Sequence, residues 1–146
     1  MSVRTAKSDG KKFELQVYHD LIKKFPISKY AIEKDVHLDD VGIQVDFLVK
    51  TNNNKIVLVV EAKGGDSLTR KDGGARRTDN VKKALANGSL YKGIYPKSKF
   101  AAYFSYAPTS NSDSDKMIKN ALALKYFDEV NYISPEITNT LEQYYG

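Results

Sequence analysis

Apolar residues recur every four positions near the start of the chain. Phe13, Val17, Leu21 and Phe25 form one stripe, which predicts an amphipathic helix over residues 11–25. The proline that follows ends this helix, because its ring has no backbone N–H to donate. A helix with one apolar stripe is expected to pack on the core through that side only.

From position 31 the four-residue spacing of apolar residues gives way to patterns that are typical of strands. Residues 31–38 predict a short strand, and residues 41–50 predict a second strand. Every second residue of the latter is apolar, and these residues are expected to share one face: Val41, Ile43, Val45, Phe47 and Val49. The run Thr51-Asn52-Asn53-Asn54 predicts a turn, since asparagine tolerates left-handed backbone. Residues 55–63 then predict a strand that is apolar on both faces as far as Val60, as in a strand covered on both sides.

The second half of the chain predicts helices and strands in turn. Thr78 or Asp79 would cap the first of its helices, and Ser112 with Asp115 resembles a capping box. The expected ranges are a glycine-rich loop at 64–78, a helix at 79–92, a strand at 99–107, a helix at 112–127, a strand at 129–133 and a last helix from Ser134. This order predicts an α/β domain with a mixed central sheet flanked by helices.

The length of 146 residues suits one domain spanning 1–146, with residues 1–9 as a loose polar lead. Hydrophobic residues make up 41% of the chain, yet no apolar run approaches the roughly 18 residues of a membrane span. The chain has no cysteine, so disulfides, thiolate zinc sites and cysteine nucleophiles are excluded. We expect a soluble, cytoplasmic protein that is not attached to a membrane.

The net charge is +5, and its distribution is more informative than its size. Seven basic residues lie between positions 63 and 83, against three acidic ones: Lys63, Arg70, Lys71, Arg76, Arg77, Lys82 and Lys83. Four glycines lie among these basic residues. We interpret the loop as an arm that grips DNA phosphates and becomes ordered on DNA. The alternative is a flexible surface loop without such a role.

Charged residues end the two central strands. Asp46 follows Val45 on one strand, and Glu61 and Lys63 end the next, two residues apart and therefore on one face. Such charges are often only solvated strand ends. If the strands are neighbours, however, both carboxylates and the backbone carbonyl of Ala62 could bind Mg²⁺, which prefers oxygen ligands. Lys63 could then stabilise the charge that develops on a phosphate.

Asp46, fourteen intervening residues and then Glu61-Ala62-Lys63 resemble the motif of the PD-(D/E)XK nuclease superfamily. The resemblance covers residues 11–107 and implies a restriction endonuclease-like core with the motif on its central hairpin. Glu14 matches an acidic residue that many members carry in the first helix. One departure is Val45, where the motif has proline.

The resemblance implies a Mg²⁺-dependent deoxyribonuclease, in which Mn²⁺ substitutes, with Glu14, Asp46, Glu61 and Lys63 as catalytic residues. Many members also place a lysine or glutamine in the following helix, facing the site. Lys82 or Lys83 would fill that place, and Asn80 is a lesser candidate. Hydrolysis would leave a 5′-phosphate.

The sequence does not decide whether the substrate is a DNA structure such as a junction or a specific DNA sequence. A compact chain favours a structure-selective endonuclease of the junction resolvase or repair type, and a type II restriction enzyme is the close alternative. Symmetric cutting would most simply use a C2 homodimer, and a larger nuclease complex is a further possible partner. Two alternatives without catalysis are a DNA-binding subunit that keeps the fold and a protein-interaction domain.

Overall fold

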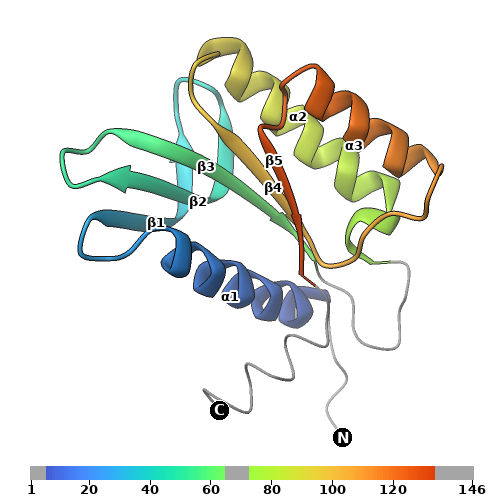
Figure 1. Ribbon diagram of the computed structural model, residues 1–146, viewed down its shortest axis with the longest axis horizontal. Coiled ribbons are helices and arrows are strands. Elements are labelled where there is room, and N and C mark those ends of the chain that lie inside the picture. Colours follow the sequence, from blue (N-terminus) through green and yellow to red (C-terminus); the bar gives the residue numbers. More distant parts are fainter. Residues whose placement is uncertain (1–5, 65–72, 134–146) are drawn as a thin grey trace, which may run out of the picture.

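A computed structural model describes residues 6–64 and 73–133, which form a five-stranded sheet between two helical layers (Figure 1). One helix covers one face of the sheet, and two helices cover the other. The elements are α1 (Ala6–Lys24), β1 (Tyr30–Leu38), β2 (Ile43–Thr51), β3 (Ile56–Lys63), a 3₁₀ turn η1 (Gly74–Arg76), α2 (Thr78–Ile94), β4 (Phe100–Phe104), α3 (Asp113–Ala123) and β5 (Glu129–Tyr132). The expected α/β class is confirmed.

The strands follow the order β1-β2-β3-β4-β5. The first three are antiparallel neighbours, because short turns join them. β4 is parallel to β3, and β5 is parallel to β4, since α2 and α3 cross over between them. The sheet is therefore mixed, as predicted, and its antiparallel half carries Asp46 and Glu61.

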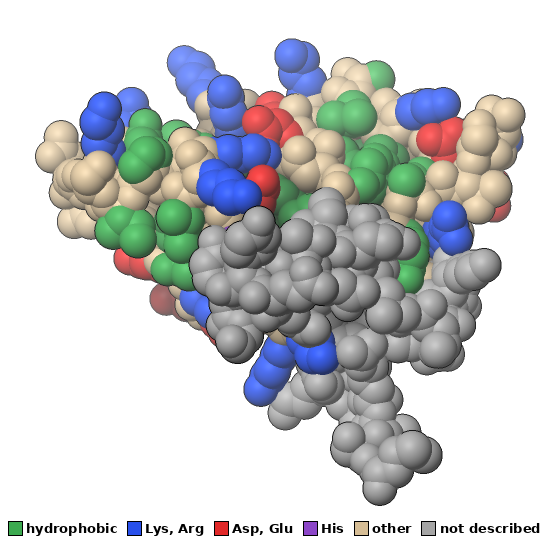
Figure 2. Space-filling model, turned by 60° about the horizontal axis from the view of Figure 1, so that its bottom comes forward, with side chains coloured by type: hydrophobic (Ala, Val, Ile, Leu, Met, Phe, Trp, Pro, Cys, Tyr) green, Lys and Arg blue, Asp and Glu red, His purple; other side chains and the backbone are tan. Residues whose placement is uncertain are grey.

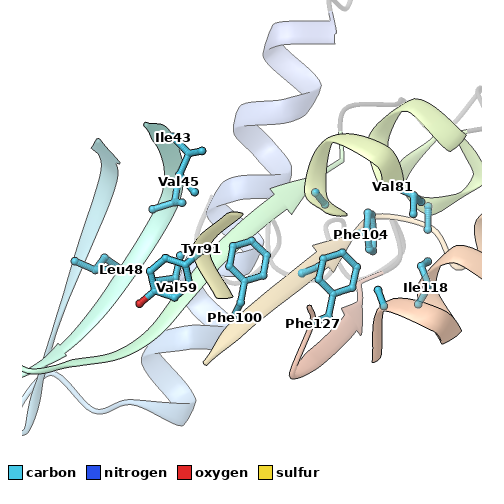
Figure 3. Close-up of a cluster of buried hydrophobic side chains, with 14 residues drawn as sticks. Ile43, Val45, Leu48, Val59, Val81, Tyr91, Phe100, Phe104, Ile118 and Phe127 are labelled. Atoms are coloured by element: carbon cyan, nitrogen blue, oxygen red, sulfur yellow. The ribbon is translucent and has the colours of Figure 1, made fainter. Parts of the chain in front are cut away.

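Two apolar clusters hold the layers together. The larger lies between the sheet and the α2–α3 layer, where Tyr91, Phe100, Phe104 and Phe127 are almost completely buried (Figure 3). The smaller lies beneath α1 and contains the predicted stripe residues Phe13, Val17 and Leu21. Both faces of β3 are thereby covered, which explains why its residues are apolar on both sides.

The alternating apolar residues of β2 do not all lie on one face of the sheet, contrary to the prediction. Ile43 and Val45 pack in the α2–α3 cluster, whereas Phe47 and Val49 pack beneath α1. The change of side falls opposite Asp35 of β1, which has a positive φ of 53°. The neighbouring strand β1 changes side at the same place, since Ile32 packs beneath α1 and Val36 packs in the α2–α3 cluster. The left-handed Asp35 interrupts the extended backbone of β1 there.

Several predicted boundaries were wrong. α1 begins at Ala6, so residues 6–9 belong to the helix and not to a loose lead. The N-cap of α2 is Arg77, whose side chain has no acceptor for capping, and Thr78 is already the first helical residue. The expected last helix, from Ser134, lies outside the described residues.

The capping box of α3 is confirmed in part. Ser112 Oγ accepts from the backbone N–H of Asp115 at 3.2 Å, whereas the Asp115 carboxylate accepts from Asn111 N instead of Ser112 N. The helix ends at Ala123, four residues before the predicted end, because Lys125 takes a left-handed φ of 63°.

Candidate functional site

Asp46 and Glu61 meet where the backbone pairing of β2 with β3 ends. The last pair on that side joins Phe47 to Val60, so the two acids are the next residue on each strand. Asp46 Oδ2 accepts a hydrogen bond from Ala62 N at 2.6 Å, and the side chains of Asp46 and Glu61 are hydrogen-bonded to each other. The predicted neighbourhood of these two acids is confirmed.

Glu61 is almost completely buried, with 3% of its surface exposed. Its Oε2 accepts from Asn87 Nδ2 of α2 at 2.5 Å. Its Oε1 lies 3.6 Å from Lys63 Nζ, so Glu61 and Lys63 share one face of β3 as predicted. Each carboxylate oxygen of Glu61 therefore has a different polar neighbour.

Burial raises the pKa of Glu61 to about 8, and both the hydrogen bond with Asp46 and the charge of Asp46 act in the same direction. Lys63 and Asn87 oppose the rise in pKa without cancelling it. At neutral pH Glu61 is therefore mostly protonated and can donate to Asp46. A buried carboxyl group with a raised pKa beside a second carboxylate is typical of a site where negative charge is concentrated.

Glu14 reaches the same place from α1. Its pKa is raised by burial and by the charges of Asp46 and Asp35, and Lys34 partly offsets the rise. The Lys34 ammonium lies 4.0 Å from Glu14 Oε2. The helical acid that the sequence singled out thus lies beside Asp46.

Asp35 belongs to this group, although the sequence reasoning missed it. One carboxylate oxygen each from Glu14, Asp35 and Asp46 lies within 4.8 Å of the other two. The signal was present in the hairpin register: Lys34 pairs with Phe47 and Val36 with Val45, which sets Asp35 opposite Asp46. Counting outward from the turn at 39–42 would have identified it.

A glycine after β3 lets α1 bring Glu14 close. A Cβ added to Gly64 would lie 2.4 Å from Phe13 Cγ, a distance that side chains cannot share. Phe13 precedes Glu14 and is itself buried in the cluster beneath α1. The glycine is therefore part of how the first helix docks against the end of β3.

Asn87 is the residue of α2 that contacts the site among the described residues, and the sequence reasoning missed it too. Lys82 and Lys83 are exposed, and Asn80 donates from Nδ2 to the carbonyl of Gly74 at 3.0 Å. Asn87 lies four residues after Lys83, on the same side of the helix. The spacing of four residues could have identified Asn87, because it lies one helical turn beyond the predicted Lys83 on the same side of the helix.

Residues 73–77 are the described end of the basic loop that we expected to become ordered on DNA, and they are already anchored by contacts within the chain. Gly73, Gly74 and Ala75 are buried, and Ala75 N donates to Tyr106 O at 3.0 Å. Gly74 has a φ of 56°, and a Cβ there would lie 2.5 Å from the backbone nitrogen of Tyr106. Residues 74 and 75 are thus fixed to the end of β4.

Arg76 is anchored in the same way. Its Nε donates to Ala107 O at 3.2 Å, and its guanidinium lies 5.4 Å from the centre of the Tyr106 ring. Arg77 is exposed, and Arg70 and Lys71 lie outside the described residues. Figure 2 shows lysine and arginine side chains spread over one face of the molecule, with acidic and hydrophobic side chains among them.

The chemistry of the donors fits a hard divalent cation. Glu14, Asp35, Asp46 and Glu61 offer only oxygen, and no cysteine exists that would favour a softer metal. Burial raises the pKa values of Glu14 and Glu61, the charge of Asp46 adds to the rise in both, and a cation would offset the repulsion between these carboxylates.

Comparisons with protein-family models, with curated proteins and with solved structures gave no match to this chain. Across residues 6–64 and 73–133, no helix is long and apolar enough to cross a bilayer.

Proposed function

We propose that this protein is a Mg²⁺-dependent endodeoxyribonuclease that hydrolyses DNA phosphodiester bonds. The observation that carries the proposal is the convergence of Asp46, Glu61 and Lys63 at one end of the central hairpin, with Glu14 beside Asp46. A cluster of acids with one adjacent lysine suits cation-assisted hydrolysis of a phosphodiester.

The order of the elements gives independent support. Helix α1, strands β1 to β3, helix α2 and strand β4 follow one another in the order that the PD-(D/E)XK resemblance implies. Asp46 and Glu61 lie on the hairpin of β2 and β3, in the middle of that order. This order of elements supports the proposal together with the short motif.

In this proposal Asp46, Glu61 and the carbonyl of Ala62 would hold Mg²⁺, and Glu14 and Asp35 would add negative charge beside Asp46. The bound cation would lower the pKa of a coordinated water and polarise the phosphodiester. The proton on Glu61 must leave before both of its oxygens are fully available as ligands.

Lys63 supplies the positive charge of the site. Its ammonium lies 3.6 Å from Glu61 Oε1 and is partly exposed, so it can contact a phosphate that approaches the acids. There it would stabilise the negative charge that develops on the phosphate oxygens, or orient the attacking water. No histidine base is required.

The exposed cations Arg77, Lys82 and Lys83 are proposed to contact the DNA backbone. We favour a structure-selective endonuclease of the junction resolvase or repair type, acting as a homodimer, because the described fold adds little to its sheet and three helices. A restriction enzyme would need further elements for base readout, for which residues 64–80 and 107–115 are the candidates.

Calorimetry with Mn²⁺ tests the proposal at the level of the site. Wild type should bind Mn²⁺, and Glu61→Gln should bind it much more weakly at equal folding. Cutting of DNA should require Mg²⁺ or Mn²⁺ and should stop in Ca²⁺. A wild type that binds no divalent cation would contradict the proposal and would favour a DNA-binding subunit without catalysis.

A further inference from the structure

One side chain of α2 reaches across to the acid at the end of β3. Asn87 Nδ2 donates to Glu61 Oε2 at 2.5 Å, over a sequence separation of 26 residues. We propose that Asn87 is a positioning residue, whose amide fixes the orientation of the Glu61 carboxylate in the candidate site. This inference rests on the proposed function, because it assigns Asn87 to the same site.

Besides its hydrogen bond with Asp46, the Glu61 carboxyl group has a different polar neighbour at each oxygen. Oε2 is taken by Asn87, and Oε1 lies 3.6 Å from Lys63 Nζ. A glutamate has three side-chain torsions, so burial alone does not select one orientation for its carboxylate. The bond from Asn87 anchors one oxygen and thereby sets the direction in which the other points. Such supporting hydrogen bonds orient the ligands of metal sites.

An amide suits this position better than a charged side chain. The surroundings of Glu61 already hold the carboxylates of Asp46 and Glu14 and the ammonium of Lys63. A second lysine would pair with Glu61 and compete with a cation, whereas another acid would add to the repulsion. Asparagine donates a hydrogen bond without changing the charge of the site.

Asn80 offers a matched comparison on the same helix. It is also half-buried, and its Nδ2 donates to the carbonyl of Gly74 at 3.0 Å, which anchors the backbone of η1. Loss of the Asn80 amide should therefore affect the stability of the loop and of the helix start. It should leave the orientation of Glu61 unchanged.

The test compares Asn87→Leu, Asn87→Gln and Asn80→Leu. Crystal structures of the metal-free proteins should show the Glu61 carboxylate displaced in Asn87→Leu and in its wild-type place in Asn80→Leu. Affinity for Mn²⁺ should fall roughly 10–100-fold in Asn87→Leu, recover in part in Asn87→Gln, and stay at the wild-type value in folded Asn80→Leu.

A Glu61 carboxylate that stays in place in Asn87→Leu would overturn the inference. So would a Mn²⁺ affinity in Asn87→Leu equal to that of a binding-competent wild type. If the wild type binds no Mn²⁺ at all, the proposed function fails instead, and the crystal structures alone decide the role of Asn87.

Discussion

The carboxylate of Asp46 and the backbone nitrogen of Ala62 are 2.6 Å apart and hydrogen-bonded. This bond ties an acid of β2 to the backbone of β3, between Glu61 and Lys63. Ala62 is buried, so its N–H has little access to water as an alternative partner. The position of Asp46 is thus fixed by a main-chain hydrogen bond.

Two substitutions at Asp46 should separate its structural role from its proposed chemical role. Asp46→Asn keeps an oxygen that can accept from Ala62 N, so it should fold with nearly wild-type stability and yet lose cleavage. Asp46→Ala also loses the acceptor, and an unpaired buried N–H should cost about 1–3 kcal/mol of unfolding free energy. Urea unfolding and a cleavage assay measure the two effects. Cleavage retained in both variants would refute the assigned site.

Stability should decrease as the pH rises through the range set by Glu61. The pKa of Glu61 is near 4.5 in the unfolded chain and about 8 in the folded protein, so the folded state binds the extra proton between these values. The stabilising effect is complete below pH 4.5 and lost above about pH 8, and its size is on the order of 5 kcal/mol.

The raised pKa of Glu14 acts in the same direction. Urea midpoints measured from pH 5 to pH 9 should fall for wild type and fall much less for Glu61→Gln, which has no proton to lose at this position. Parallel curves for the two proteins would show that Glu61 does not titrate as described.

Alanine at Gly64 should disturb the docking of α1. The new Cβ would lie 2.4 Å from Phe13 Cγ, so Phe13 must shift and Glu14 must shift with it. We expect a loss of about 1–3 kcal/mol in unfolding free energy and reduced cleavage. Gly93 in α2 is the control, because a Cβ there meets open space. Gly93→Ala should be neutral or stabilising, and equal behaviour of the two variants would contradict the packing argument.

Two lysines should respond in opposite ways to replacement by methionine. Lys63→Met should cut the cleavage rate roughly 100-fold with little change in stability, because it removes charge from the candidate site. Lys92 is buried and donates to Asp128 Oδ2 at 2.7 Å, away from that site. Lys92→Met should cost roughly 3 kcal/mol of stability and leave the rate per folded molecule unchanged. A wild-type rate in Lys63→Met would remove Lys63 from the mechanism.

Local sequence patterns predicted several helices, strands and turns of the fold correctly. The stripe of α1, the asparagine turn and the doubly apolar strand β3 depend on neighbouring residues, and each appears where expected. Asp46 and Glu61 could be paired from sequence because the turn between their strands is short. The neighbourhood of Lys63 and Glu61 followed from strand periodicity alone.

The site residues and contacts that the sequence analysis missed depend on how strands and helices pack against one another. Asp35 enters the site through the register of β1 on β2, and Asn87 through the rotation of α2 against the sheet. The face change in β2 lies opposite the left-handed Asp35 of β1, and aspartate gives only a weak signal for that conformation. The anchoring of Arg76 depends on backbone groups after β4, which no local pattern in its own loop reveals.

The most direct test of the central claim is a Mg²⁺ cleavage panel of wild type and Glu61→Gln on supercoiled plasmid, linear duplex, single strand and a four-way junction. We predict cutting by wild type that Glu61→Gln loses, with paired symmetric nicks confined to the junction and 5′-phosphate ends. A fixed set of plasmid bands would agree with a nuclease and would favour a type II restriction enzyme over a junction resolvase. The absence of Glu61-dependent cutting on every substrate would contradict the account.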